Sequence, residues 1–164
     1  MSLLSDIVEL NRLAKLQPDY QLIDYNPVLL PMLTPRGTDS VFFDNIAGFA
    51  TVLTGFAEMG PAYMATHKGQ VICAFGCIPL WPGVGECWLL PDVSLPEHRR
   101  PFHRVTKLIL DSFMSELNLI RLQITVHSEN VLAHKWAKVL YFKQEGVLKR
   151  FGPDGKDFYM LART

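Results

Sequence analysis

Four basic side chains occur close together at a point where a helix is expected to begin. They are Arg99, Arg100, His103 and Arg104. The first turn of a helix presents backbone N–H groups that lack partners, and arginine side chains add positive charge, so the two together can bind a phosphate group. A solvated basic loop has the same composition. The segment therefore predicts either an anion site or an ordinary exposed loop.

The histidines, cysteines and serines lack the neighbouring residues that a metal site or a nucleophilic catalytic site would need. His127 and His134 are seven residues apart with no third ligand in helical register, so we expect no metal site. Cys73 and Cys77 are four residues apart on one expected strand and should pack in the core as thiols. No Ser-His-Asp order and no G-x-S-x-G elbow is present, so hydrolase chemistry is unsupported.

The elements that position these residues follow from hydrophobic periodicity. Strands are expected at 20–25, 62–67, 70–81, 87–94 and 121–127, with a closing hairpin over 145–163. Helices are expected at 4–16, just after Pro27, across 41–59, and at 105–117 and 128–140. Ser128 and Asn130 are the capping candidates of the last helix. This order predicts an α/β fold with a mixed central sheet and helices on both faces, in one domain over 19–164 preceded by a helical arm over 1–18.

The stretch from about Tyr63 to Arg163 resembles the GNAT superfamily of N-acetyltransferases. The likeness rests on PEHRR before a helix, a strand ending in HSEN, a helix reaching KVLYF, and the closing EGVLKRFGPDGKDFYML. In that family a V-x-P-E-x-R-R type stretch leads into a Q/R-x-x-G-x-G/A loop, whose amides hold the cofactor pyrophosphate. A later Asn-x-x-Ala helix matches Asn130 and Ala133. The resemblance is strongest to the subgroup that acetylates ribosomal-protein N-termini, and it implies a GNAT-like fold.

The resemblance also implies a co-substrate and a site. Acetyl-coenzyme A would be the acetyl donor, and an amine or a protein N-terminus would be the acceptor. The implied cofactor-binding residues are Asp92, Val93, Arg99, Arg100, His103, Arg104 and Asn130. Glu86 is the implied base, acting through water, because the family often has a carboxylate near this point of the strand. An ordinary surface glutamate is the alternative.

Two departures from the family pattern concern the chemistry directly. If Arg99 takes the leading place of the family's loop motif, the two glycines of that motif correspond to Phe102 and Arg104. A side chain at these positions obstructs the close approach of the backbone to the cofactor that glycine permits. The tyrosine that usually protonates the leaving thiolate corresponds to Ala137. We therefore expect weak acetyl-coenzyme A binding with little or no acetyl transfer, which leaves open whether this acetyltransferase fold is an active enzyme.

A second hypothesis is a non-catalytic interaction module. The Glu86-Cys87-Trp88 strand, the His103-Arg104 helix start and Asn130 resemble a degenerate acetyltransferase-like protein of tailed bacteriophages. In that case the chain would be a virion or assembly protein, with virion or homo-oligomer contacts as its partners. A third hypothesis, nucleic-acid binding over 99–107, lacks interleaved aromatic and basic residues.

Composition narrows the partners and the compartment. Lys and Arg number 16, as do Asp and Glu, so no bulk charge draws the chain to nucleic acid or to an anionic membrane. No apolar run reaches the length of a membrane span, and the first fifteen residues do not resemble a signal peptide. The three cysteines are an odd number without a Cys-x-x-Cys pair. These features favour a cytoplasmic protein, in the host cytoplasm or the virion if phage-encoded.

Overall fold

A mixed seven-stranded sheet runs through the centre of the structure, a computed structural model that describes residues 2–164. Its strands are Tyr20–Asp24 (β1), Ala62–His67 (β2), Gln70–Trp81 (β3), Val84–Pro91 (β4), Arg121–His127 (β5), Lys143–Leu148 (β6) and Phe158–Arg163 (β7). They lie in the order β1-β2-β3-β4-β5-β7-β6. Neighbours are antiparallel except β4 and β5, which are parallel.

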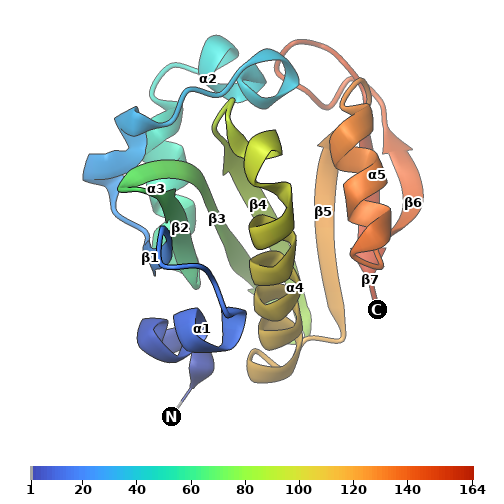
Figure 1. Ribbon diagram of the computed structural model, residues 1–164. Coiled ribbons are helices and arrows are strands. Elements are labelled where there is room, and N and C mark those ends of the chain that lie inside the picture. The colour runs from blue at the N-terminus through green and yellow to red at the C-terminus, as the bar shows by residue number, and fades with distance from the viewer. Residues whose placement is uncertain (1) are drawn as a thin grey trace.

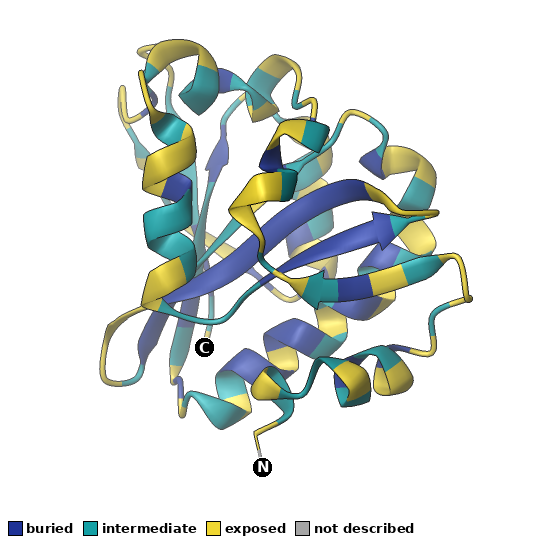
Figure 2. Ribbon diagram, turned by 90° about the vertical axis from the view of Figure 1, so that its left-hand side faces the viewer, coloured by how far each residue is buried: buried dark blue, intermediate teal, exposed yellow. Residues whose placement is uncertain are grey.

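Helices cover both faces of this sheet, as Figures 1 and 2 show. The α-helices are Ile7–Ala14 (α1), Val41–Asn45 (α2), Phe49–Met59 (α3), Arg99–Glu116 (α4) and Val131–Val139 (α5), and short 3-10 helices span Leu3–Ser5, Pro27–Met32, Gly37–Asp39 and Leu95–His98. One face carries α1, α4 and α5, and the other carries α3. The α/β class and the mixed sheet with helices on both faces are therefore confirmed. No helix within residues 2–164 is long and apolar enough to cross a membrane.

Each face of the sheet has its own hydrophobic core. The larger core lies under α1, α4 and α5 and includes the fully buried Ile109, Phe113, Leu122 and Leu161. The smaller core lies under α3 and the 27–33 segment and is built around Leu53, Met64 and Leu90. Strand β3 is buried on both faces, so it is continuously apolar rather than alternating (Figure 2).

Strands β4 and β5 separate along their length. They pair only over Val84–Glu86 and Arg121–Gln123, and their carboxyl-terminal halves then diverge. The 3-10 helix and α4 follow the end of β4, and α5 follows the end of β5, so α4 and α5 start from the same edge of the sheet (Figure 1). Strands β3, β4 and β5 are therefore neighbours in the sheet, and the last two are splayed apart at their carboxyl ends.

Two helix boundaries differ from the predicted ones. The single helix expected across 41–59 is two helices, because the chain leaves the helical conformation at Ile46 and Gly48 takes a left-handed φ of 71°. Helix α4 begins at Arg99 rather than at Val105. Pro101 lies within the first turn, where a backbone N–H has no partner inside the helix, so its missing N–H costs no helical hydrogen bond.

The segment expected as an N-terminal arm packs against the rest of the fold. Leu10 and Ala14 of α1 are buried in the larger core. The Arg104 guanidinium of α4 donates a hydrogen bond of 3.0 Å to the carbonyl of Lys15, at the end of α1. Asn11 joins α1 to β1, because its side chain both donates to and accepts from the backbone of Leu22 at 2.8 Å. These bonds fix α1 between β1 and α4.

Candidate functional site

Glu86 lies where β4 and β5 begin to separate. It faces Gln123 across the last pair of the parallel ladder, and the Gln123 amide donates a hydrogen bond of 2.8 Å to its carboxylate. The Arg121 Nε donates to the side-chain oxygen Oε1 of Gln123 at 2.9 Å, and its guanidinium is paired with Glu145 at 2.6 Å. The Gln123 amide therefore holds the Glu86 carboxylate at the fork, and Arg121 connects Gln123 in turn to Glu145 on β6.

Glu86 faces the α3 side of the sheet. Neighbouring side chains on a strand point to opposite faces. Cys87 packs against the larger core, whereas Trp88 packs against the smaller one beneath α3. Burial, together with a hydrogen bond to Cys77, raises the pKa of the Cys87 thiol, and burial also raises the pKa of Cys73. Both thiols are therefore neutral at physiological pH and are weak nucleophiles.

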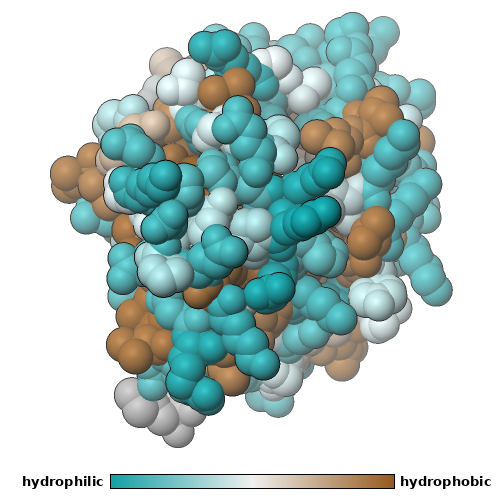
Figure 3. Space-filling view, viewed as in Figure 1, coloured by the Kyte–Doolittle hydropathy of each residue, from teal (hydrophilic) through white to brown (hydrophobic). Residues whose placement is uncertain are grey.

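The start of α4 carries the exposed cations. Arg99 and Arg100 are exposed, and within residues 2–164 neither forms an ion pair with a carboxylate. Their charge is thus available to an anion at this helix start. Pro101 supplies no backbone N–H, so one amide that could bind a phosphate is absent. Hydrophilic side chains predominate on this face of the molecule (Figure 3).

An aromatic pair joins the two helices above the diverging strands. The rings of Phe102 on α4 and Trp136 on α5 stack with centroids 5.1 Å apart and an interplanar angle of 29°. The Trp136 indole Nε1 donates a hydrogen bond of 3.2 Å to Nδ1 of His103. With Nδ1 as the acceptor, the imidazole of His103 carries its proton on Nε2. These two contacts connect α4 to α5 across the gap that the diverging strands create.

Phe102 does not lie over the helix start. Its side chain is 6% exposed and turns into the larger core, where it meets the Phe75 ring at a centroid distance of 6.2 Å. The Phe102 ring therefore does not lie where a phosphate would bind at the helix start, as was expected. Together with the Trp136 ring it fills the space between α4 and α5. Arg104, the other residue in a glycine position, is exposed and contacts α1 instead.

Asp92 and Val93 organise the loop after β4. The Asp92 carboxylate accepts hydrogen bonds from the backbone N–H of Thr34 at 2.7 Å and of Ser94 at 2.9 Å. Burial acts to raise the pKa of Asp92, but the bonds from Ser94 and Thr34 outweigh it and lower this pKa. The backbone N–H of Val93 donates to the Thr34 carbonyl at 3.1 Å. Both residues thus tie the 27–34 segment to the end of β4.

Asn130 is the N-cap of α5. Its Oδ1 accepts a hydrogen bond of 3.0 Å from the backbone N–H of Ala133, as one of the two predicted caps should. Its Nδ2 donates to Asp39 at 3.1 Å. Burial raises the pKa of Asp39, although the bond from Asn130 opposes that shift. The contact attaches the 37–45 segment to the start of α5, at the mouth of the diverging strands.

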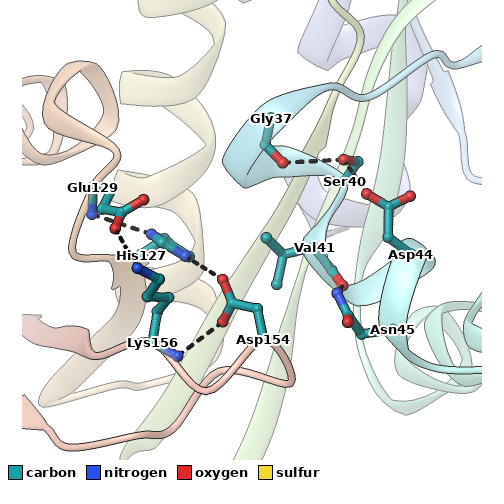
Figure 4. Close-up of polar contacts among 9 residues, drawn as sticks. All are labelled: Gly37, Ser40, Val41, Asp44, Asn45, His127, Glu129, Asp154 and Lys156. Carbon is teal, nitrogen blue, oxygen red and sulfur yellow. Dashed lines mark hydrogen bonds and ion pairs between the residues drawn. The ribbon is translucent and has the colours of Figure 1, made fainter.

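A buried histidine near this mouth is a feature that the sequence did not reveal. His127 is 4% exposed; its Nδ1 accepts the backbone N–H of Glu129 at 3.1 Å and its Nε2 lies 2.9 Å from the Asp154 carboxylate (Figure 4). An imidazole that accepts at Nδ1 donates from Nε2, so His127 donates to Asp154. The two residues are 27 positions apart with no shared motif, and the sequence indicates only that Asp154 lies within the expected closing hairpin over 145–163.

The exchange Asp154→Asn is expected to lower stability at neutral pH. The hydrogen bond from His127 lowers the pKa of Asp154, against a smaller opposing effect of burial. A carboxylate with a lowered pKa stabilises the fold above its unfolded-state pKa of about 4, and this contribution is lost as the pH falls through the folded-state value. Urea denaturation at pH 7, 5 and 3 should therefore show a difference from the wild type that shrinks on acidification. The exposed Asp19→Asn is the control, and a difference independent of pH would contradict the prediction.

A cavity of about 410 Å³ lies on the α3 side of the sheet, near the end of β4. It lies between the 27–35 segment and the 40–50 segment. Its lining residues are Pro27, Leu30, Pro31, Leu33, Thr34, Pro35, Ser40, Phe43, Asp44, Ala50 and Leu90. None of the residues implied by the resemblance lines this cavity.

The implied site residues thus occupy three places. Arg99, Arg100 and His103 share the start of α4, and His103 also contacts α5 through Trp136. Asn130 lies at the start of α5, and Asp92 lies at the end of β4, bonded to the 27–34 segment. Glu86 lies near the amino end of β4, on the α3 face of the sheet. The arrangement gives a helix start with two exposed arginines, an aromatic contact that joins α4 to α5, and a carboxylate at the fork.

Known proteins resemble this chain in fold but not closely in sequence. No family model matches the chain, and no curated protein sequence matches it. The ribosomal L7/L12 α-N-protein acetyltransferase RimL, solved with coenzyme A, aligns over 90% of this chain and 94% of its own with a TM-score of 0.66 and 12% identity. Ard1 from Thermoplasma volcanium aligns over 88% and 97% with a TM-score of 0.66 and 14% identity.

A third solved structure is the spermidine N-acetyltransferase SpeG from Vibrio cholerae. It covers 90% of this chain and 94% of its own, with a TM-score of 0.63 and 15% identity. The sheet and helices described above are thus those of an acetyltransferase fold. More specifically, the chain has the fold of the GNAT acetyltransferases, as the resemblance predicted.

Proposed function

We propose that this protein is an N-acetyltransferase of the GNAT type, with a degenerate cofactor loop, that transfers acetyl from acetyl-coenzyme A to an amine. The observation that carries the proposal is the fork between β4 and β5, with Glu86 at its base and two helix starts at its open end. The names of the structural neighbours support an amine acceptor, because RimL is an α-N-protein acetyltransferase and SpeG a spermidine N-acetyltransferase.

The residues at the start of α4 suit the charged part of acetyl-coenzyme A. Arg99 and Arg100 have free guanidinium groups there, and guanidinium binds phosphate in a bidentate way. The Nε2–H of His103 is a further donor. When bound, acetyl-coenzyme A supplies an activated acetyl thioester. The stacked Phe102 and Trp136 occupy the space between α4 and α5, so the Trp136 indole has to move before a long, thin ligand can lie there.

Glu86 would handle the proton of the acceptor amine. An amine is nucleophilic only after it has lost its extra proton, and a carboxylate can receive that proton through a water molecule. The amide of Gln123 orients the Glu86 carboxylate, which is only partly buried. Ala137 stands where the family has its acid and offers no proton, and Tyr141 is 66% exposed at the far end of α5. The leaving thiolate would then take its proton from solvent, which makes transfer slow.

The alternative is a protein that keeps this fold as an interaction module, as in a phage particle, without transfer. The aromatic contact between Phe102 and Trp136 favours it, because that contact closes the space a cofactor would use. The two hypotheses differ in one simple respect. The transferase binds acetyl-coenzyme A, and the interaction module does not.

Titration with acetyl-coenzyme A tests the proposal. Calorimetry should give a saturable heat, and the ligand at about a hundred times its dissociation constant should stabilise the fold by about 2.7 kcal/mol. For a chain of this length that corresponds to a rise in melting temperature of roughly 5–10 °C. Release of free thiol in the presence of a peptide amine then measures transfer. No binding up to millimolar acetyl-coenzyme A would contradict the proposal and favour the interaction module.

A further inference from the structure

Two histidines and a tyrosine meet where the β1 edge of the sheet faces the start of α4. Tyr20 begins β1, His67 ends β2 as its partner across the ladder, and His98 is the residue before α4. The imidazoles of His67 and His98 have centroids 4.6 Å apart. The Tyr20 ring lies 4.5 Å from that of His67 and 5.4 Å from that of His98. These three side chains, which we call the ring cluster, join the sheet edge to the helix start.

The two histidines are held in the ring cluster by different contacts. The Tyr20 hydroxyl and Nδ1 of His98 are 2.7 Å apart, which is a hydrogen bond. A phenol both donates and accepts, so this bond persists whether the imidazole of His98 is neutral or protonated. His67 joins the cluster through its contacts with the other two rings. His67 is therefore the member that a change in charge can displace.

The ring cluster suits neutral imidazoles. Both histidines are half-buried, and within residues 2–164 no carboxylate forms an ion pair with His67 or His98. Burial lowers the pKa of His98 and the charge of His67 lowers it further, against opposite effects of Glu97 and Asp92. Two imidazolium rings at this separation repel each other. The cluster therefore opposes the uptake of a second proton.

Other charged side chains surround the ring cluster on each element that meets there. Asp19 and Lys68 flank it on the sheet edge and Arg99 flanks it on α4, and all three are exposed. Glu97 precedes His98 in the 3-10 helix, and Asp92 lies in the loop after β4. Among side chains of these types, histidine is the one that ordinarily changes charge between pH 5 and 8. Protonation of the two imidazoles is thus the event to which the cluster responds as the pH falls.

We propose that the ring cluster is a pH-sensitive contact, which is closed while His67 and His98 are neutral and opens when both are protonated. A base whose pKa is lowered in the closed state takes up its proton more readily in the open one. The closed contact is therefore fully favoured above the ordinary histidine pKa of about 6.5, and this preference is lost as the pH falls below that value. Because Arg99 and Arg100 directly follow His98, opening frees the helix start that carries these two cations. The contact belongs to the free protein, so the proposal does not depend on acetyl transfer.

An NMR titration of the histidine ring signals from pH 8 to 5, on the full chain without acetyl-coenzyme A, tests the coupling of the two imidazoles. In His67→Gln the pKa of His98 should rise, because the neighbouring charge is gone. His134→Gln is the control: it removes a histidine of α5, outside the ring cluster, and should leave the pKa of His98 unchanged. An unchanged pKa of His98 in His67→Gln, or an equal rise in His134→Gln, would overturn the proposal.

Hydrogen exchange of the backbone amides measures the opening itself. After correction for the intrinsic pH dependence of exchange, the amides of 20–24 and 103–107 should lose protection in the wild type between pH 7.5 and 5.5. The opening constant should change about tenfold for each pKa unit by which the closed and open states differ. His67→Phe keeps a ring beside Tyr20 without the charge, so it should remain protected at pH 5.5, as should His67→Gln, whereas His134→Gln should open as the wild type does. Melting curves show whether each variant is folded. If protection does not fall in the wild type, or falls equally in a folded His67 variant, the cluster is not a pH-sensitive contact and the proposal fails.

Discussion

Exchange of Glu86 for glutamine is expected to lower the rate of acetyl transfer by roughly a hundredfold, in the range that a general base contributes. Glutamine has nearly the same shape and can still accept the hydrogen bond that Gln123 donates at 2.8 Å, but it cannot take a proton. The loss should therefore fall on kcat, with acetyl-coenzyme A binding retained. Thiol release at saturating acetyl-coenzyme A and amine measures the rate, and calorimetry measures the binding.

A matched control lies in the same polar chain. Glu145→Gln weakens the ion pair with Arg121 at 2.6 Å but leaves the Glu86 carboxylate and its bond to Gln123 in place. We expect its rate to stay close to that of the wild type, because Glu145 is exposed and does not reach the fork. If Glu86→Gln keeps the wild-type rate, or if both variants lose the same factor, Glu86 is not the base.

Local patterns were sufficient to predict much of the sheet. The alternating or continuously apolar runs of β2, β3 and β5 have strong periodicity, and a parallel pair needs a crossover helix, which α4 supplies between β4 and β5. Asn130 was identified as a cap candidate because a short polar side chain before an apolar helix has few other roles. These features depend on neighbours in the chain, which a sequence displays directly.

Contacts between distant residues were not predictable in this way. Trp136 and His103 are 33 residues apart, and their bond depends on how far α4 and α5 are from each other. His127 and Asp154 meet only once the β6–β7 hairpin has folded back onto the start of α5. Asp39 reaches Asn130 across 91 residues. Nothing in the local sequence of these residues marks them as partners.

The position of the Phe102 side chain differs from the one that the family motif predicted. Alignment with the family loop suggested that its ring blocks a phosphate at the helix start. Because the chain is already helical from Arg99, the Phe102 side chain points to the buried side of α4, and it is 6% exposed. The helix start itself keeps the exposed Arg99 and Arg100. The obstacle to cofactor binding has therefore moved from the phosphate end to the space between α4 and α5.

Removal of the Trp136 indole is consequently expected to tighten acetyl-coenzyme A binding by about five- to 150-fold. In the wild type a ligand between the helices must separate the Phe102 and Trp136 rings, 5.1 Å apart, and break the bond from Trp136 to His103. An aromatic pair is worth about 0.5–1.5 kcal/mol and a hydrogen bond a similar amount, so their loss costs roughly 1–3 kcal/mol of binding energy. In Trp136→Ala this cost is absent. Calorimetric titration of the two proteins at one temperature gives the ratio of dissociation constants.

Trp81→Ala is the matched control, because Trp81 is 62% exposed at the β3–β4 turn, next to the amino end of β4, whereas both helix starts follow the carboxyl ends of β4 and β5. It should leave acetyl-coenzyme A binding unchanged. The Trp136 exchange should also lower the stability of the free protein, since Ala cannot cover the Phe102 ring, so melting curves must show that the variant is folded at the titration temperature. Tighter binding by a less stable protein would identify the indole as a closed gate over the cofactor site. Weaker binding in a folded variant would instead make the indole part of the binding surface, and the space between the helices would then be open to a ligand as it stands.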